Sequence, residues 1–281
     1  MKKLIMLLSF TTIFLLAACQ RAVPSALECQ ENGEPLKVGM SLQYPPFETR
    51  ENNVPVGISV DIAKAFGEHI GCEIEIVDMN FGNLIDALIL GDIGVIIASM
   101  SATPAREELI MFSDPYMYFQ IIGLMNKDFA DAQGYTEDTT VDEILANEDV
   151  TYVGIAGQVS ASLPLDLGIP QSRVLFSSDL DSAAQRVVLG DVDVLMMSSS
   201  PVLRNHVLYP DDTIVIWDSF LASPIAMGMR QGETELQALA NEFIASMFEE
   251  GGVYEQIRAD WDAALREILL DREGLDFFLR E

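Results

Sequence analysis

The chain has 281 residues, enough for one large or two modest domains, and 49 % of them are apolar, which is enough for a sizeable core. Its formal net charge is −28, and its acidic residues are spread over the whole length. Phosphate binding needs clustered cations, so this balance argues against nucleic acid as a partner. We interpret the acidic surface as solubilising, and the attraction of cationic ligands is the alternative.

An N-terminal leader is the first feature along the chain. Two lysines precede an apolar run from Leu4 to Leu16, and small residues then lead to Cys19. The charge, the length and this ending are typical of a secretory signal, and the run is too short to span a bilayer. Leu-Ala-Ala-Cys also resembles a bacterial lipobox, which implies cleavage of residues 1–18 and lipid on Cys19. The alternative is a plain signal peptide with an incidental cysteine.

Two further cysteines remain if Cys19 carries lipid. Cys29 lies in a polar stretch, residues 19–35, that we interpret as a tether, and Cys72 comes just before the second expected strand. Compartments beyond the inner membrane are oxidising, so a disulfide between them is allowed. Sequence alone does not determine connectivity, so a disulfide and two free thiols both stay open.

Strands and helices are expected to alternate in the first part of the chain. Leu36–Met40 is an apolar strand, and Ser41–Phe47 is a turn stiffened by two prolines. Gly57–Gly71 has apolar residues near a period of 3.6, which predicts a helix. A strand at Glu73–Val77 follows, and another helix begins at Phe81.

The stretch from Gly94 to Tyr116 contains the residues that we expect to bind an anionic group. Gly94–Ala98 predicts a buried strand, and Pro104 ends it because proline has no N–H for a ladder. Thr103 suits an N-cap with proline at the first helical position. Backbone N–H groups at such a turn attract anions, and Arg106 adds a planar cation suited to a carboxylate. Phe112–Tyr116 is expected to leave the first domain.

The second part of the chain is also expected to alternate. A capping box opens a helix at Thr140, and another helix at Ser182–Leu189 is closed by Gly190. Strands are expected at 120–125, 152–155, 193–197 and 214–217, an acidic loop at 128–139, a serine turn at 198–201, a return crossing at 219–224, a strand at 225–229 and an amphipathic helix at 233–249.

Several motifs resemble one family. Ser101–Arg106 reads Ser-Ala-Thr-Pro-Ala-Arg, and Phe112–Tyr116 reads Phe-Ser-Asp-Pro-Tyr. This pair, after an apolar strand, resembles the family 3 bacterial extracellular solute-binding proteins, which serve polar amino-acid ABC transporters. Tyr44–Phe47 and Gly251–Trp261 fit the same pattern, so the resemblance covers about Val38–Trp261.

The resemblance implies a periplasmic-binding-protein-like α/β fold with two α/β lobes joined by a two-strand hinge. Lobe 1 would comprise residues 36–115 and 225–261, and lobe 2 would comprise residues 116–224. Residues 262–281 are then a C-terminal extension, whose apolar residues we expect to pack on their own lobe. Such a fold binds a small solute in the cleft and closes over it.

The resemblance also implies a carboxylate site. Arg106 would clamp the carboxylate, supported by Ser101 and by backbone N–H groups near Val159. Tyr44 and Phe81 would hold the body of the ligand between them, although either aromatic residue could instead be a core residue.

The amine end departs from the family pattern. Ser99 would offer its backbone carbonyl to an amine, and Gln158 stands where the family usually has threonine. Ser198 stands where the family usually has an aspartate that accepts hydrogen bonds from an α-ammonium group. A hydroxyl cannot neutralise an ammonium, so either the amine is recognised elsewhere or the ligand is not an ordinary α-amino acid.

These features predict a lipid-anchored solute-binding protein, a monomer at the periplasmic or cell-surface side of a membrane. It would capture an amino acid or a related small carboxylate and deliver it to an ABC transporter permease. We expect no catalytic residue, cofactor or metal site, since His69 and His206 are isolated. The alternatives are an enzyme on the same scaffold, similar to a dehydratase, and a ligand-sensing module for a separate partner.

Overall fold

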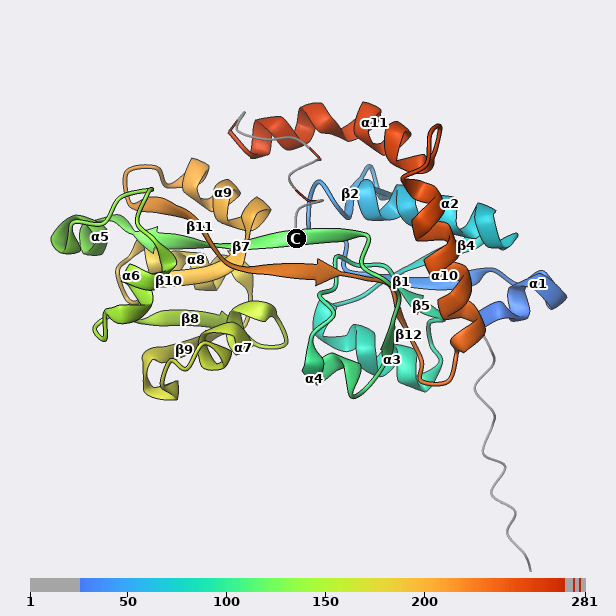
Figure 1. The fold of residues 1–281 in the computed structure, drawn as a ribbon, viewed down its shortest axis with the longest axis horizontal. Coiled ribbons are helices and arrows are strands. Elements are labelled where there is room, and N and C mark those ends of the chain that lie inside the picture. The colour runs from blue at the N-terminus through green and yellow to red at the C-terminus, as the bar shows by residue number, and fades with distance from the viewer. Residues whose placement is uncertain (1–25, 271–274, 276–277, 279–281) are drawn as a thin grey trace, which may run out of the picture.

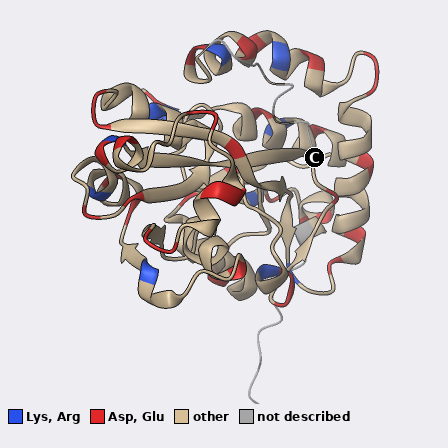
Figure 2. Cartoon of the chain, turned by 60° about the vertical axis from the view of Figure 1, so that its left-hand side comes forward, with Lys and Arg blue, Asp and Glu red and all other residues tan. Residues whose placement is uncertain are grey.

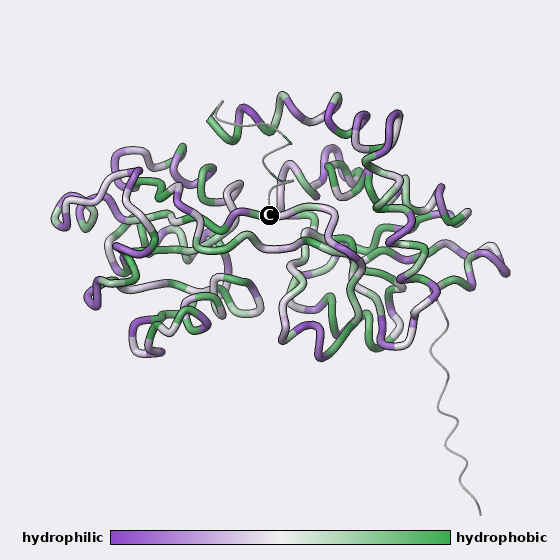
Figure 3. The backbone as a smooth tube through the Cα atoms, viewed as in Figure 1, coloured by the Kyte–Doolittle hydropathy of each residue, from purple (hydrophilic) through white to green (hydrophobic). Residues whose placement is uncertain are grey.

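The computed structural model describes residues 26–270, 275 and 278. Two five-stranded mixed sheets, each covered by helices, form two lobes (Figure 1). In lobe 1 the strand order is β4-β1-β5-β12-β6, and in lobe 2 it is β11-β7-β10-β8-β9. The strands are largely hydrophobic and the outer turns hydrophilic (Figure 3). Acidic residues lie on both lobes (Figure 2).

Lobe 1 combines early and late parts of the chain. Its sheet strands are β1 (Leu36–Met40), β4 (Ile74–Asp78), β5 (Val95–Ile96), β6 (Met111–Phe112) and β12 (Gly228–Met229), and a small hairpin comprises β2 (Thr49–Glu51) and β3 (Val54–Val56). Its helices are η1 (Ala26–Glu28), α1 (Cys29–Asn32), α2 (Ile58–Ile70), η2 (Phe81–Asn83), α3 (Leu84–Leu90), α4 (Pro104–Glu107), α10 (Thr234–Met247) and α11 (Val253–Ile268).

Lobe 2 is built from the middle of the chain. Its strands are β7 (Met117–Asn126), β8 (Tyr152–Ile155), β9 (Val174–Ser177), β10 (Val194–Ser198) and β11 (Thr213–Ile225). Its helices are α5 (Lys127–Gln133), α6 (Val141–Ala146), α7 (Val159–Asp166), η3 (Gln171–Arg173), α8 (Leu180–Val188) and α9 (Ser199–Leu208).

The long strands β7 and β11 connect the lobes. They pair antiparallel and run side by side across the middle of the molecule (Figure 1), with Met117 opposite Ile225 at their lobe 1 end. Ile225 also forms a β-bridge with Ser101. The chain segment that carries the predicted site is therefore attached directly to the connection between the lobes.

Helix α2 has the boundaries that its sequence predicted. It begins after Gly57 and ends at Gly71, whose φ of 72° is the left-handed C-cap conformation that glycine adopts at low cost. Its apolar residues recur with helical spacing, and Phe66 and Ile70 are buried in the core. Gly71 and Cys72 close the helix with N–H groups donated to the carbonyls of its last turn.

Two local expectations were wrong. Residues 128–139 were expected to be a loop, but α5 occupies the first part, because the Asn126 side chain accepts the Phe129 N–H at 3.0 Å and caps it. Residues 198–201 were expected to be a turn, but α9 begins at Ser199. Pro201 lies in its first turn, where a missing N–H removes no helical hydrogen bond.

The helix at Pro104 is much shorter than expected. α4 has four residues, and the Thr103 side chain makes no cap hydrogen bond. The strand expected at 225–229 is also short, because the pairing with β7 extends through Ile225 and only Gly228–Met229 joins the lobe 1 sheet. The chain therefore turns between elements over most of the region around Arg106.

Cys29 and Cys72 form a disulfide bond, with their Cα atoms 5.6 Å apart. The bond fastens α1 to the loop after α2 across a sequence separation of 43 residues. Of the two alternatives left open by the sequence, the structure contains the bonded one. Cys19 lies outside the described residues.

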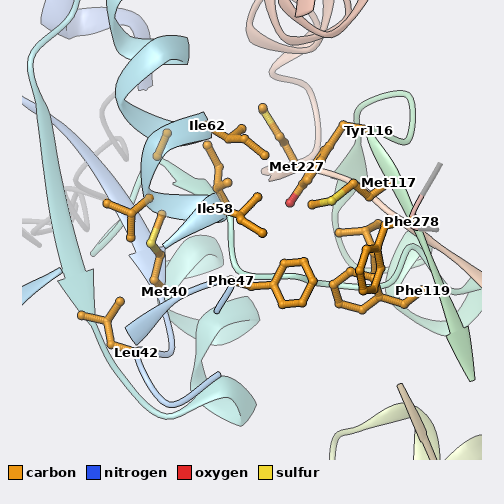
Figure 4. Packing of buried hydrophobic residues seen from close by; sticks show 14 of the residues in the cluster. Met40, Leu42, Phe47, Ile58, Ile62, Tyr116, Met117, Phe119, Met227 and Phe278 are labelled. Carbon is orange, nitrogen blue, oxygen red and sulfur yellow. The ribbon is translucent and has the colours of Figure 1, made fainter. Parts of the chain in front are cut away.

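Phe278, near the C-terminus, packs at the junction of the lobes. Leu275 and Phe278 are buried, and the Phe278 ring lies edge-on to Phe47 of lobe 1 and Phe119 of β7, at centroid distances of 5.1 and 5.4 Å (Figure 4). The expectation that the extension packs on its own lobe is therefore incomplete, since Phe278 also contacts the connecting strand.

Within the described part of the chain, no helix combines the length and apolar character needed to cross a membrane.

Candidate functional site

One cavity of about 180 Å³ lies between the lobes. Lobe 1 lines it through the turn after β1, η2 and the segment from β5 to α4, and lobe 2 lines it through the starts of α7 and α8 and the end of β10. The structure brings every predicted ligand-binding residue to this cavity: Tyr44, Phe81, Ser99, Ser101, Arg106, Gln158, Val159 and Ser198. Their contact with a ligand remains a prediction.

Arg106 joins the two lobes. Its Nη1 donates to the Ser101 carbonyl of lobe 1 at 2.8 Å, and its Nη2 donates to the Gly157 carbonyl of lobe 2 at 2.9 Å. The guanidinium also lies over the Phe81 ring, 5.3 Å from its centroid, which is a cation–π arrangement. Burial lowers the pKa of Arg106 to about 10, so the side chain is still cationic at neutral pH.

The backbone of Gly157 makes this interlobe contact possible. Its φ is +79°, a conformation that side chains other than glycine rarely adopt. A Cβ added at this position would come within 3.8 Å of the Gly82 Cα of lobe 1, which is ordinary van der Waals distance. A larger residue at position 157 would strain the turn that presents the carbonyl to Arg106.

Tyr44 forms a second link between the lobes. It belongs to the turn after β1, and its hydroxyl lies 2.5 Å from Ser198 Oγ at the end of β10. Its ring stacks on Phe47 and Phe119 at centroid distances of 5.5 and 6.0 Å. Burial raises the pKa of Tyr44, so the phenol stays neutral. Ser200 Oγ makes a third link, donating to the Pro45 carbonyl at 3.0 Å.

Glu48 is a cavity residue that sequence reasoning missed. It is 1 % exposed, and its Oε2 accepts the Ser99 hydroxyl at 2.9 Å. The Ser59 hydroxyl lies 3.4 Å from the same Ser99 oxygen. Desolvation raises the pKa of Glu48 from 4.5 to about 8, although the hydrogen bonds from Ser59 and Ser99 oppose the shift. A single acid after an aromatic turn gives no sequence signal that it will be buried.

Ser99, which donates to Glu48, has an uncommon backbone conformation. Its φ is 51°, which is uncommon for a residue other than glycine and costs on the order of 1–3 kcal/mol. Such outliers concentrate at functional sites. The expected role of the Ser99 carbonyl toward an amine remains a prediction, and the structure adds a role for its hydroxyl.

The lobe 2 wall is formed by the start of α7. Val159 is the first residue of this helix and Gln158 is its N-cap residue, without a side-chain cap hydrogen bond. Gln158 Oε1 is buried in the cavity wall and has no hydrogen-bond partner among the described residues. An unpaired buried acceptor is costly, so a donor on a bound molecule would stabilise it.

The profile of the bacterial extracellular solute-binding proteins, family 3, matches residues 36–263. The chain belongs to this family. The fold class expected from the sequence is thereby confirmed, and the match makes the chain an extracellular solute-binding protein.

Relatives of this solute-binding protein include several named for amino acids. The arginine-binding extracellular protein ArtP of Bacillus subtilis (strain 168) is 39 % identical over 118 residues, which are 41 % of this chain and 45 % of ArtP. The arginine-binding periplasmic protein of Mannheimia haemolytica is 27 % identical over 232 residues, covering 79 % of this chain and 89 % of that protein.

The family scaffold also occurs in other settings. The membrane-bound lytic murein transglycosylase F of Desulfosudis oleivorans is 28 % identical over 201 residues, which are 70 % of this chain and 42 % of the transglycosylase. The matched part of the solute-binding protein thus spans less than half of both ArtP and this transglycosylase. Among solved structures, the ancestral amino acid-binding protein AncCDT-1, described as a precursor of cyclohexadienyl dehydratase, has a TM-score of 0.68 at 26 % identity, covering 84 % of this chain and 99 % of that chain.

Proposed function

We propose that this solute-binding protein captures an amino acid or a related small carboxylate and delivers it to the permease of an ABC transporter. The observation that carries the proposal is the placement of Arg106, whose guanidinium lies in the interlobe cavity and donates to a carbonyl of each lobe. A planar guanidinium matches a carboxylate with two parallel hydrogen bonds. Relatives named for arginine binding support an amino acid as the ligand.

Binding would couple to closure of the lobes. β7 and β11 connect the lobes, and the cavity walls come from both, so a ligand completes its contacts only when the lobes meet. The carboxylate would take the place of the Gly157 carbonyl or join it on Arg106. Tyr44 and Phe81 would contact the body of the ligand, as their positions in the wall allow.

Membrane attachment is a separate part of the proposal. The Leu-Ala-Ala-Cys sequence supports lipid on Cys19. The tether expected at residues 19–35 is shorter than that range, because η1, α1 and the Cys29–Cys72 disulfide attach residues 26–32 to lobe 1. A protein anchored in this way would act at the periplasmic or cell surface beside its permease, as a monomer. Metabolic labelling with a clickable palmitate analogue tests this part: labelling of the wild type and loss of labelling in Cys19→Ser are expected, and an unlabelled wild type would refute it.

The experiment on ligand capture begins with a thermal-shift screen against amino acids, amines and organic acids. Calorimetry with the best ligand then compares the wild type with Arg106→Ala, which we expect to lose about 2–5 kcal/mol of binding free energy. Arg173→Ala is the matched control, because Arg173 also donates to two backbone carbonyls, those of Val150 and Asn147, but inside lobe 2. Equal affinity of the wild type and Arg106→Ala would refute the proposal.

An enzyme on the same scaffold is a second candidate, and one observation favours it. Glu48 is a buried cavity carboxyl whose raised pKa, about 8, keeps most of it protonated at neutral pH, as a general acid requires. The best ligand of the screen is therefore incubated with the protein and followed by proton NMR. An unchanged spectrum supports a binding protein, and conversion that Glu48→Gln abolishes would support the enzyme.

A further inference from the structure

We propose that Glu48 is the counter-ion for an ammonium group of the ligand, so that the cavity selects zwitterions with the carboxylate on Arg106 and the amine on Glu48. This inference rests on the proposed function and narrows the class of ligand for the same cavity. It also answers the question raised by Ser198, whose hydroxyl contacts Tyr44 and cannot neutralise an ammonium.

The Glu48 carboxyl and the Arg106 guanidinium are both bound to one short piece of chain. Glu48 accepts from Ser99 Oγ at 2.9 Å, and Arg106 donates to the Ser101 carbonyl at 2.8 Å. Ser99 and Ser101 are two positions apart, and a fully extended chain spans at most about 3.6 Å per residue, so their Cα atoms are separated by about 7 Å at most. A molecule with its carboxylate and ammonium a few bonds apart can reach both groups.

Glu48 has no cationic partner within the described part of the protein. No described lysine, arginine or histidine lies within ion-pair distance of its carboxyl. The phenols of Tyr44 and Tyr116 feel the charge of Glu48, which together with burial raises the pKa of both, and the Tyr116 hydroxyl has no hydrogen-bond partner among the described residues. A carboxyl buried in a ligand cavity without a counter-ion is unfavourable when ionised, and an incoming ammonium would relieve that cost.

The ammonium also matches the remaining hydrogen-bonding capacity. An ionised carboxylate has about four acceptor positions on two oxygens, and the hydroxyls of Ser99 and Ser59 take at most two of them. Three N–H donors of an ammonium can therefore share Glu48 with neighbouring acceptors of the wall. Ser99, with its hydroxyl on Glu48 and its strained backbone, holds the carboxyl in the cavity.

Asp179 of lobe 2 is the rival acid, because it also lines the cavity. Its oxygens are occupied: they accept from Ser182 N at 2.8 Å, Ser182 Oγ at 3.0 Å and Ser178 Oγ at 2.5 Å, and it caps α8. These hydrogen bonds lower the pKa of Asp179, and its side chain is exposed to water. Water screens such a charge, so the buried Glu48 is the stronger partner for an ammonium.

Calorimetry with matched pairs of probes tests the inference. The probes are L-arginine, L-histidine and L-glutamine, each compared with the acid that lacks only the α-amine: 5-guanidinopentanoate, 3-(imidazol-4-yl)propanoate and glutaramate. We expect the wild type to bind at least one amino acid about 30-fold or more tightly than its acid, as for loss of one member of a buried charge pair. Glu48→Gln, which keeps the shape and removes the charge, should reduce this preference to about threefold or less.

Asp179→Asn is the matched control, because asparagine also caps a helix well and removes the rival charge. The preference for the amino acid should survive in this variant. Loss of the preference in Asp179→Asn, or its survival in Glu48→Gln, would overturn the assignment to Glu48.

The wild-type comparison needs no variant and decides the question even if Glu48→Gln does not fold. Equal binding of an amino acid and its acid would overturn the zwitterion inference and leave the capture of carboxylates standing. Absence of binding by all of the probes would overturn the proposed function, and the inference would fall with it.

Discussion

The hydroxyl of Tyr44 lies 2.5 Å from the hydroxyl of Ser198, and this hydrogen bond joins the two walls of the cavity. Tyr44 belongs to lobe 1 and Ser198 ends β10 of lobe 2. The contact therefore exists only when the lobes are together. The Arg106 hydrogen bond to the Gly157 carbonyl also joins the two lobes at this cavity.

Tyr44→Phe removes the interlobe hydrogen bond and keeps the ring. A hydrogen bond contributes about 0.5–1.5 kcal/mol net, so we expect ligand affinity to fall about 2- to 12-fold through a less stable closed state. Calorimetry with the best ligand of the thermal-shift screen measures the change. Tyr135→Phe is the control, because it removes a 2.9 Å hydrogen bond from Asn147 that lies inside lobe 2. An equal loss of affinity in both variants would contradict a role in closure.

Phe278→Ala tests the packing at the junction of the lobes. Phe278 is 1 % exposed and contacts the rings of Phe47 and Phe119. Truncating a buried phenylalanine costs about 3–5 kcal/mol of unfolding free energy, which urea denaturation followed by circular dichroism will measure. Phe248→Ala is the control, since Phe248 is 44 % exposed and should lose far less. Similar losses in the two variants would show that Phe278 is not packed as described.

Removing the disulfide should destabilise lobe 1. The bond between Cys29 and Cys72 spans 43 residues, and the chain-entropy relation gives about 4 kcal/mol for a loop of that length. The double variant Cys29→Ser/Cys72→Ser should lose a comparable amount in chemical denaturation. Reducing agent should lower the stability of the wild type and leave that of the double variant unchanged. A wild type insensitive to reductant under unfolding conditions would contradict the bond.

Glu48 should make the unliganded protein less stable as pH rises. Its pKa in the folded state, about 8, is above its ordinary value of 4.5, so the folded state binds the proton more tightly than the unfolded state. Glu48 therefore disfavours folding progressively from pH 4.5 to about 8, and the penalty is constant above that range. Glu48→Gln removes the penalty, so its melting temperature relative to the wild type should rise across this window.

Glu143 is a control whose pKa is shifted in the opposite direction. Hydrogen bonds from Thr140 lower the pKa of the exposed Glu143 carboxylate, so its contribution is present above its ordinary pKa and is lost as pH falls below it. Glu143→Gln should consequently differ from the wild type most at neutral pH and least in acid. A flat pH dependence for the difference between Glu48→Gln and the wild type would contradict the burial of an unpaired Glu48.

The strands and helices with strong local signals were predictable. β1 agrees with the expected strand at Leu36–Met40, and α2 begins and ends at the glycines that its periodicity indicated. α9 was missed because Pro201 was interpreted as a turn residue, although proline is compatible with a first helical turn. α5 was missed because acidic residues dominated the interpretation of a segment whose N-cap is Asn126.

The site residues that belong to sequence motifs were predictable. The site residues whose position depends on tertiary packing were not. Arg106 and Ser101 belong to a recognisable motif, and the structure places both in the cavity. Glu48 follows the aromatic turn, but its burial depends on packing against Ser99 and Ser59, which are distant in sequence. The contacts of Phe278 could not be predicted from its neighbours in sequence, since its partners Phe47 and Phe119 lie in a turn and a strand far away in the chain.

The position of Phe278 has a use in sensor engineering. Its ring packs against Phe119, which stacks with Tyr44, and Phe278 itself does not line the interlobe cavity. Phe278 therefore lies at the junction of the lobes but outside the cavity. A single environment-sensitive fluorophore attached near this residue could report the proposed movement of the lobes without entering the interlobe cavity. The same feature warns that trimming the chain at the family boundary would remove part of the interior of the protein.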